Sequence, residues 1–484
     1  MRSTALALAS ALAACSSSGQ QAATPAWVND TSSYGGADAK SPLAERYRDV
    51  AAKIIATARA DRGAYKKLAY LTDHIGPRLA GSPALGKAIA WAAQAMKDDG
   101  LDVRTEKVMV PHWVRGVEDA AITSPVARSI RVLTLGGSVP TPKGGITAPV
   151  VVVRDWKELD TKAEQIKGAI VVYNVAMPAW SPDKGSGYGS IVGYRSTGAS
   201  QAAKRGAVAA LVRSVTARSL STPHTGAMRY DKDQPKIPVA SITVEDAELL
   251  QRLTETDKVT VRLRIEPQEH PDVESANVIG ELRGRDKPDE IVLISGHIDS
   301  WDVGQGAHDD GAGCVTMMQA LATLKRLGLT PRRTIRVVLF TNEENGLRGA
   351  RSYAEQHKAE LGKHVLALES DSGGFAPRGF GVGHKDPDAA KRMRARLSEV
   401  AALMGPLGKL RVVEGHGGSD IEPMKPAGVP HVGLDVHNST YFDYHHTEAD
   451  TLDKVDPQDL ADMVAAVAVL AYVVADLPDR VDAP

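Results

Sequence analysis

The sequence predicts an α/β fold in which a mostly parallel or mixed sheet is flanked by helices and interrupted by an inserted β-rich domain. After residue 272, short apolar runs alternate with helical runs, as in a mostly parallel sheet. Between residues 115 and 271, short β-rich runs follow one another across Gly-rich and Pro-rich turns. The chain has 484 residues, which is too long for one ordinary core. We therefore expect two domains.

Residues 1–15 have the pattern of a lipoprotein signal peptide, with Cys15 as the lipidated first mature residue. One cationic side chain precedes a small apolar stretch that is too short to span a bilayer. An ordinary secretory signal with an incidental cysteine is the alternative. Residues 16–40, rich in Ser, Gly, Gln and Ala, are expected to form a flexible tether. We expect an exported protein, either secreted or a bacterial cell-envelope lipoprotein on the periplasmic side, that meets the membrane only through Cys15.

Residues 41–114 are predicted to form the first part of the main domain. Residues 42–100 have a helical pattern that breaks at residues 76–78 and 81–83, where Gly and Pro cannot continue a helix. Residues 101–111 alternate as a strand. The inserted domain then occupies residues 115–271, with strands expected at 129–137, 148–156, 168–174, 206–214, 237–243 and 258–266.

Residues 272–484 are predicted to complete the main domain. Its strands are expected at 275–284, 290–296, 334–341, 364–370, 409–415 and 431–436, with helices that include 313–328 and 346–361. The apolar run at residues 463–477 is shorter than a membrane span and is predicted to be a core helix.

The composition excludes two classes of function. There are 58 Lys and Arg residues against 59 Asp and Glu, a formal net charge of -1, so no basic field is available to hold nucleic acid. The only cysteines are Cys15 and Cys314. Cys314 lies in an apolar helical run, where a buried and inert thiol is expected. Neither a disulfide framework nor a cysteine hydrolase is expected.

Acidic and imidazole side chains gather after the predicted strands and in one Gly-rich loop. They are His297, Asp299, Asp309, Asp310, Glu343, Glu344, Asp371 and a histidine of the Tyr444-His445-His446 run. In open α/β sheets, ligands bind beyond the carboxyl ends of the strands. Carboxylates so close together repel one another unless a cation lies among them. The pattern therefore predicts a site for two divalent metal ions and a hydrolytic reaction.

Each of these residues also has a purely structural interpretation. The Asp309-Asp310 pair would suit a turn, and Asp371 before Ser-Gly-Gly would suit another. The Glu343-Glu344 pair would stabilise a helix N-terminus, and either histidine of the 445–446 pair would suit the surface. Their joint occurrence, in this order and at strand ends, favours the metal site.

Several sequence blocks resemble the co-catalytic zinc exopeptidases related to aminopeptidase Y and the transferrin receptor. They are GHIDSWDVGQGAHDDGAG, NEENGLRGA, ESDSGG and YHHTEADT. The blocks LTDHIGPRLAGSP, VPHWVRG and HGGSDI resemble the plasma glutamate carboxypeptidase (carboxypeptidase Q) branch of that family. The resemblance runs from about residue 43 to 477. It implies a zinc exopeptidase fold with an inserted protease-associated domain, and a homodimer.

The resemblance implies two zinc ions per chain, with manganese or cobalt as substitutes. The implied ligands are His297 and Asp371 on one ion, Glu344 and His446 on the other, and Asp309 bridging both. His446 is preferred to His445 because the family pattern His-Thr/Ser-x-x-Asp-Thr aligns with residues 446–451.

The same resemblance implies that Glu343 is the general base and that Asp299 is the carboxylate that orients His297. His308 stands where an apolar residue is commoner in these relatives. It is either an additional ligand or, as we expect, a side chain that points away from the metals.

The resemblance further implies an exopeptidase for short peptides, with dipeptides carrying a free amino terminus as the preferred substrate. Ser419 and Asp420 of the HGGSDI block are candidates to bind a peptide terminus, and capping of the following helix is their alternative role. Two other functions stay open. One is a non-catalytic binding ectodomain on this scaffold, and the other is a single-zinc acyltransferase of the glutaminyl-cyclase kind.

Overall fold

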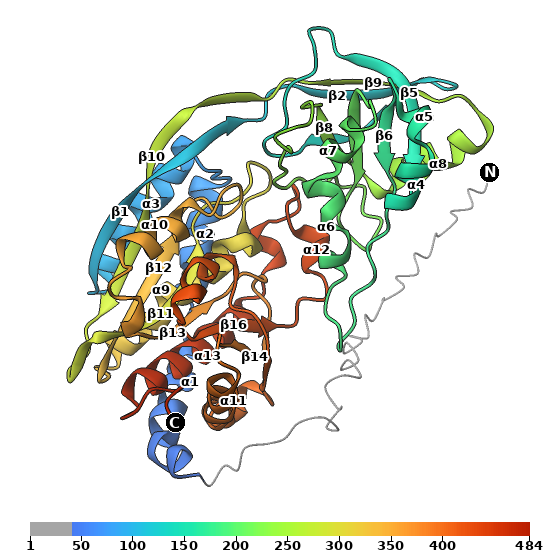
Figure 1. Cartoon of the computed structure of the whole chain (residues 1–484). Coiled ribbons are helices and arrows are strands. Elements are labelled where there is room, and N and C mark those ends of the chain that lie inside the picture. Colours follow the sequence, from blue (N-terminus) through green and yellow to red (C-terminus); the bar gives the residue numbers. More distant parts are fainter. Residues whose placement is uncertain (1–40) are drawn as a thin grey trace, which may run out of the picture. The chain divides into compact units, whose positions relative to one another are not determined.

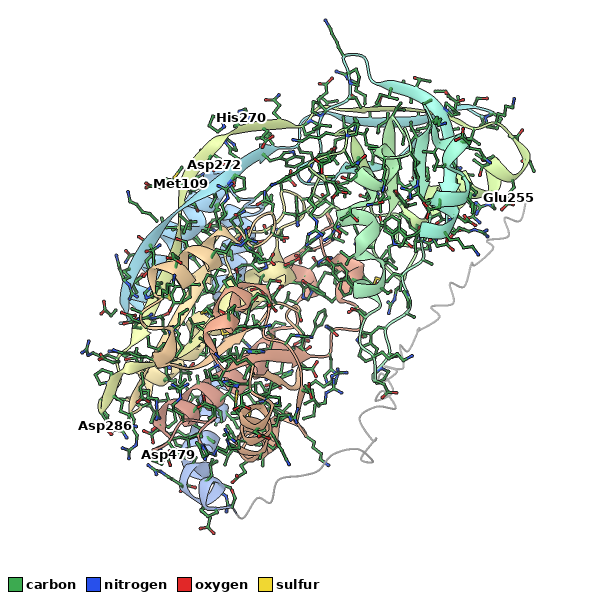
Figure 2. All side chains as sticks on the ribbon, viewed as in Figure 1. Met109, Glu255, His270, Asp272, Asp286 and Asp479 are labelled. Carbon is green, nitrogen blue, oxygen red and sulfur yellow. The ribbon has the colours of Figure 1, made fainter. Side chains whose placement is uncertain are left out.

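The computed structural model describes residues 41–484, and the predicted signal peptide, tether and Cys15 lie outside these residues. The described strands form two eight-stranded sheets (Figure 1). A long antiparallel ribbon connects them, because the chain passes from the first sheet to the second after Val114 and returns after Ile265. Figure 2 shows Met109 of this ribbon near His270 and Asp272 of its second strand.

The first sheet is mixed and has the order β1-β10-β12-β11-β13-β16-β14-β15. Its strands are β1 (Asp102–Val114), β10 (Gln268–Leu282), β11 (Lys287–His297), β12 (Arg333–Phe340), β13 (His364–Glu369), β14 (Pro377–Gly383), β15 (Arg411–Glu414) and β16 (His431–Val436). In the centre, β11 runs parallel to both β12 and β13, and β13 runs parallel to β16. The predicted α/β class with a mixed sheet is confirmed.

The described α-helices that lie outside residues 118–265 accompany this sheet. They are α1 (Pro42–Ala60), α2 (Gly63–Tyr70), α3 (Pro83–Asp98), α9 (Ala312–Arg326), α10 (Arg348–Gln356), α11 (Pro387–Ala402), α12 (Tyr441–Tyr444) and α13 (Pro457–Asp476). The break predicted at residues 81–83 starts α3, because the Ser82 hydroxyl accepts the Leu85 N–H and Pro83 occupies the first turn. The break at residues 76–78 begins at Gly76, whose φ of 76° ends the preceding turn.

Helix α13 is part of the core of the main domain. By length and composition it is the one helix within residues 41–484 that could cross a membrane, yet 83% of its 18-residue apolar window is buried inside the structure. It packs against α1 and α9. The predicted core helix at residues 463–477 is therefore confirmed.

The second sheet is built only from strands between Glu118 and Ile265, in the order β3-β2-β9-β5-β6-β7-β8-β4. Its strands are β2 (Glu118–Ser124), β3 (Arg128–Ile130), β4 (Val132–Thr134), β5 (Ile146–Val153), β6 (Ile170–Tyr173), β7 (Ala209–Arg213), β8 (Val239–Ile242) and β9 (Thr260–Ile265). The accompanying helices are α4 (Trp156–Thr161), α5 (Ala163–Ile166), α6 (Tyr188–Ser196), α7 (Gly198–Ala203) and α8 (Val244–Thr256). The division into a main and an inserted domain is our interpretation of these two sheets.

Two details differ from the sequence prediction. The run 129–137, expected as one strand, divides into β3 and β4, which lie at opposite edges of the second sheet. The division falls at Arg131, whose backbone N–H donates a hydrogen bond to the Asp246 carboxylate instead of to a strand. Strand β14 was not predicted, because its three glycines weaken the apolar pattern that marks a strand. A Cβ at Gly379 would lie 2.0 Å from the Arg411 carbonyl oxygen, so glycine is required where β15 approaches.

The burial of α13 leads to a stability test. Leu470 is fully buried, and Leu470→Ala should lower the free energy of unfolding by about 2–5 kcal/mol in chemical denaturation, because it leaves a cavity. Leu220 is 44% exposed, so Leu220→Ala should change it by less than about 0.5 kcal/mol. Equal effects of the two substitutions would contradict a core role for α13.

Candidate metal centre and cavity

Three parallel strands end side by side and carry the chemical groups of the site. Strand β11 ends at His297, which is paired in register with Phe340 at the end of β12. Strand β13 ends at Glu369, two residues before Asp371. Glu343 and Glu344 follow β12 within a few residues. Because parallel strands end at the same edge, side chains far apart in the sequence meet there.

The polar atoms form two groups that share Asp309. In the first group, Nε2 of His297 lies 3.3 Å from Oδ1 of Asp309 and 3.6 Å from Oδ1 of Asp371. In the second group, Nε2 of His446 lies 3.2 Å from Oδ2 of Asp309 and 3.1 Å from Oε2 of Glu344. Asp309 therefore presents a different carboxylate oxygen to each group.

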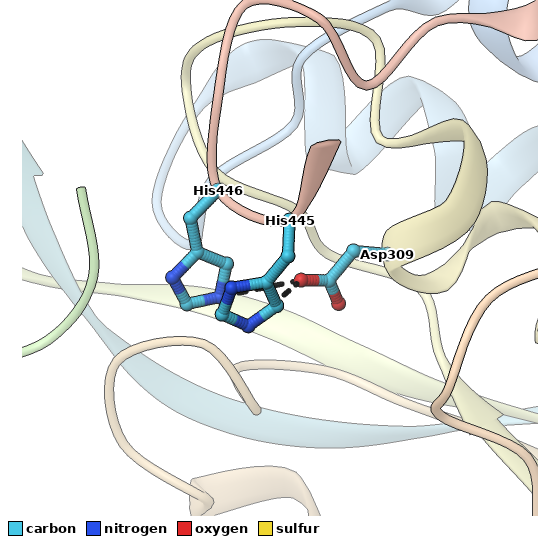
Figure 3. Close-up of side chains that lie close together, drawn as sticks. All are labelled: Asp309, His445 and His446. Carbon is cyan, nitrogen blue, oxygen red and sulfur yellow. Dashed lines mark ion pairs between the residues drawn. The ribbon is translucent and has the colours of Figure 1, made fainter. Parts of the chain in front are cut away.

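His445 and His446 lie together against Asp309, with ring centroids 3.5 Å apart (Figure 3). Nε2 of His445 is 3.7 Å from Oδ2 of Asp309. His446 approaches this oxygen more closely and also contacts Glu344. His446 is thus the histidine that joins the two carboxylates of the second group.

The residues at this centre fit a pair of divalent metal ions. Nε2 of His297 and Oδ2 of Asp309 are buried and have no hydrogen-bond partner within the described part of the chain. Buried polar atoms are normally satisfied, so unpartnered ones need an explanation. Ligand atoms of His297, Asp309 and Asp371 lie within 4.8 Å of one another, as do those of Asp309, His445 and His446. Imidazole nitrogen and carboxylate oxygen are donors that zinc accepts.

The raised pKa values of the carboxylates in the cluster also indicate that a positive charge is needed nearby. Burial and, to a smaller extent, the nearby Asp309 carboxylate raise the pKa of Glu344 to about 8. Burial, together with the carboxylates of Asp371 and Asp299, raises the pKa of Glu343 to about 7. These directions mean that the ionised forms are unfavourable here without a compensating cation.

Asp299 supports the centre differently from the way we expected. Its carboxylate accepts the backbone N–H groups of Glu343 at 3.1 Å and Glu344 at 3.3 Å, which fixes the start of that loop. Nδ1 of His297 lies 3.1 Å from the Asp299 backbone carbonyl and 3.8 Å from its carboxylate. The His297 imidazole thus donates to the main-chain carbonyl of Asp299, while the Asp299 carboxylate accepts the backbone N–H groups of the two glutamates.

Two further carboxylates hold the loop that carries Asp309. The Asp450 carboxylate accepts the N–H groups of His308 at 2.7 Å and Asp309 at 3.1 Å. The Asp310 carboxylate accepts the N–H of His297 at 3.1 Å and that of Gly313 at 3.2 Å. The first contact of Asp310 links this loop to the end of β11. Sequence reasoning assigned no role to Asp450, although it lies in the YHHTEADT block.

His308 belongs to neither group of possible metal ligands. Its Nδ1 accepts the Gly374 N–H at 3.0 Å, and its ring stacks on Phe375 with centroids 4.5 Å apart. Burial lowers its pKa to about 4. His308 is therefore a neutral packing residue that points away from the metal ligands, as we expected.

Arg78, which lies in the loop predicted at residues 76–78, is completely buried. Its guanidinium donates to the backbone carbonyls of Ile298 at 2.6 Å, Gln305 at 2.9 Å and Gly306 at 3.0 Å. These carbonyls belong to the loop between β11 and Asp309. Arg78 therefore fixes the path of the ligand-bearing loop and brings a positive charge close to the acidic cluster.

A residue from the part of the chain that forms the second sheet, Thr225, also contacts the centre. Nδ1 of His446 lies 3.2 Å from the Thr225 carbonyl oxygen, and the Thr225 N–H donates to the His446 carbonyl at 3.0 Å. This pairing orients the imidazole so that Nε2 faces Asp309 and Glu344. No sequence pattern near His446 indicated this contact, because Thr225 is more than 200 residues earlier in the chain.

A cavity of about 500 Å³ opens onto the centre. Its walls include Asp309, Glu343, Asp371, Tyr188, Arg195 and Ser419. Of the two proposed substrate residues, Ser419 lies on this wall, whereas Asp420 is completely buried behind it. The Glu369 carboxylate accepts the Asp420 N–H at 3.3 Å, and burial together with this carboxylate raises the pKa of Asp420.

Comparisons with known proteins agree over most of the chain. The model of peptidase family M28 matches residues 277–471. Carboxypeptidase Q of Mus musculus is 43% identical over 438 residues, which cover 90% of each protein. The crystal structure of a peptidase M28 precursor from Shewanella amazonensis has 36% sequence identity and a TM-score of 0.85, covering 90% of this chain and 98% of that one. The zinc aminopeptidase BSAP from Bacillus subtilis has 22% identity and a TM-score of 0.63, covering 85% and 94%, and shows the shared fold.

The role of Asp450 can be tested by metal binding. Asp450→Ala leaves the N–H groups of His308 and Asp309 without their acceptor, so the affinity for zinc should fall by roughly 10- to 100-fold in a competition titration with a chelator. The exposed Asp453 in the same segment provides the control, and Asp453→Ala should leave the affinity unchanged. Unchanged affinity in Asp450→Ala would show that the loop holds Asp309 without it.

Proposed function

The chain belongs to peptidase family M28 and is a metallopeptidase, and from this premise we propose a di-zinc exopeptidase that hydrolyses short peptides, with dipeptides as its main substrates. The position of Asp309 carries the proposal. Its two carboxylate oxygens face separate groups of ligands, His297 with Asp371 and His446 with Glu344. One carboxylate shared in this way is the arrangement needed to bridge two ions.

His297 and Asp371 would hold one ion, Glu344 and His446 the other, and Asp309 both. When bound, such ions supply positive charge that polarises a carbonyl and acidifies water. Their charge would also offset the burial of these carboxylates and the repulsion among them, both of which disfavour the ionised forms.

Glu343 is the proposed proton carrier. It lies on the cavity wall and is only partly buried, whereas Glu344 is buried and faces His446. Glu343 would accept a proton from the attacking water and donate it to the nitrogen of the leaving amine. Asp299 keeps Glu343 in position through the backbone N–H.

The preference for short peptides rests on the relatives and on the cavity. One relative is a carboxypeptidase and a more distant structural neighbour is a zinc aminopeptidase. On a dipeptide both names describe cleavage of the same bond. A cavity of about 500 Å³ is in the range of sites for small molecules. A non-catalytic ectodomain would have no need of Glu343 beside a full set of ligands, which favours an enzyme.

The test is a hydrolysis screen with a dipeptide library on protein whose metal content has been measured. We expect cleavage of dipeptides, loss of activity after chelation and recovery with zinc. Pyroglutamate formation, assayed on the same samples, should be absent. Protein with two bound metals per chain and no hydrolysis would overturn the proposal, and pyroglutamate formation in its place would favour the glutaminyl-cyclase alternative.

The role of Glu343 has a separate test. Glu343→Gln keeps the size of the side chain but removes the proton acceptor, so kcat should fall by about 10²–10⁴-fold while both metals stay bound. Glu355 is an exposed glutamate of the following helix, and Glu355→Gln should leave kcat and metal content unchanged. A metal-loaded Glu343→Gln enzyme with normal turnover would contradict the role of proton carrier.

A further inference from the structure

Arg195, near the end of α6, is a buried cation without an anionic partner. The residue is 7% exposed. Its Nη2 donates to the Tyr188 hydroxyl at 2.8 Å, and its Nε is buried without a hydrogen-bond partner. Within residues 41–484, no carboxylate forms an ion pair with this guanidinium. Buried guanidinium groups are normally paired, because an isolated charge is costly to remove from water.

A role as the hydrogen-bond partner of His446 does not account for Arg195. Its Nη1 lies 3.4 Å from Nδ1 of His446. The Thr225 carbonyl already faces that Nδ1 at 3.2 Å and accepts its proton. Because a carbonyl oxygen can only accept, Nδ1 carries the ring proton in this pairing, and Nδ1–H and Nη1–H are both donors. The guanidinium and the imidazole therefore cannot form a hydrogen bond with each other.

Arg195 lies close to where a dipeptide would react. Arg195 and Tyr188 line the same cavity as Glu343. The imidazole of His446 lies between Arg195, on its Nδ1 side, and Glu344, on its Nε2 side. In a dipeptide, three covalent bonds separate the scissile carbonyl carbon from the carbon of the C-terminal carboxylate. A carboxylate this close to the reacting bond can reach Arg195 from the centre.

We propose that Arg195 and Tyr188 bind the C-terminal carboxylate of the substrate and so select peptides whose leaving residue is the C-terminal one. The proposal rests on the peptidase function above and specifies its substrate. Guanidinium groups bind carboxylates through strong, charge-assisted hydrogen bonds. The Tyr188 hydroxyl accepts from Arg195 and keeps its own proton for a carboxylate oxygen. Dipeptides with a free carboxyl group satisfy both donors.

The test compares a dipeptide that has a free carboxyl group with its C-terminal amide, by kcat/KM on zinc-loaded enzyme. Wild-type enzyme should prefer the free acid by roughly 10-fold or more. Arg195→Met should lower kcat/KM for the acid by roughly 10- to 100-fold and change the value for the amide by less than about threefold. Tyr188→Phe removes one donor only and should lower the value for the acid by about 10-fold. Arg195→Lys keeps the charge but not the forked geometry, and should recover part of the loss.

Arg351 provides the matched control, because it is an exposed arginine on the wall of the same cavity. Arg351→Met should change the ratio of acid to amide by less than about twofold. A larger change at Arg351 than at Arg195 would overturn the assignment.

An equal loss on acid and amide in Arg195→Met, or loss of a bound metal, would assign Arg195 to the support of His446 and also overturn it. Wild-type enzyme that cleaves no dipeptide would overturn the peptidase proposal and this one together, whereas equal cleavage of acid and amide would overturn only the carboxylate assignment.

Discussion

Repulsion among buried carboxylates at the carboxyl edge of the first sheet is the constraint on which the centre depends. Burial raises the pKa of Glu343, Glu344 and Asp371, and the nearby Asp309 carboxylate raises the pKa of each further. Backbone N–H groups and positive charge balance this cost. The carboxylates of Asp299, Asp310 and Asp450 each accept two main-chain N–H groups, so these three serve as anchors for loops. Asp309, Glu344 and Asp371, the proposed acidic metal ligands, each turn a carboxylate oxygen toward His297 or His446 instead.

The anchors explain why loops can carry so exact a set of ligands. Asp309 lies on an irregular segment with non-helical backbone angles, and a loop of this kind would be mobile by itself. Asp450 holds it from one side, and Arg78 holds the preceding loop from another. Both anchors come from distant parts of the sequence. The precision of the site therefore depends on the folding of the whole main domain, in agreement with the need to hold ligands rigidly.

The sequence allowed the fold class and the convergence at strand ends to be predicted, because both arise from local patterns. Apolar runs of strand length mark β11, β12 and β13, and polar residues after them mark the edge of the sheet. Strand β14 escaped prediction because its glycines lower the apolar signal, although a close backbone neighbour requires them. The roles of Asp450, Arg78 and Arg195 were also not predicted from the sequence. Each acts through a contact with a residue more than 100 positions away, and no local periodicity encodes such a pair.

Chemistry and selectivity come from different parts of the chain. The histidines and carboxylates that face Asp309 follow strands of the first sheet or lie in its loops, whereas Tyr188 and Arg195 come from a helix that accompanies the second sheet. A proton carrier and a pair of cations recognise any peptide bond, since they contact only the reacting atoms. In our proposal, the Arg195 guanidinium instead contacts the substrate residue on the C-terminal side of that bond. A relative could therefore keep the reaction and change the terminus it prefers through α6 alone, without disturbing the repulsive balance at the centre.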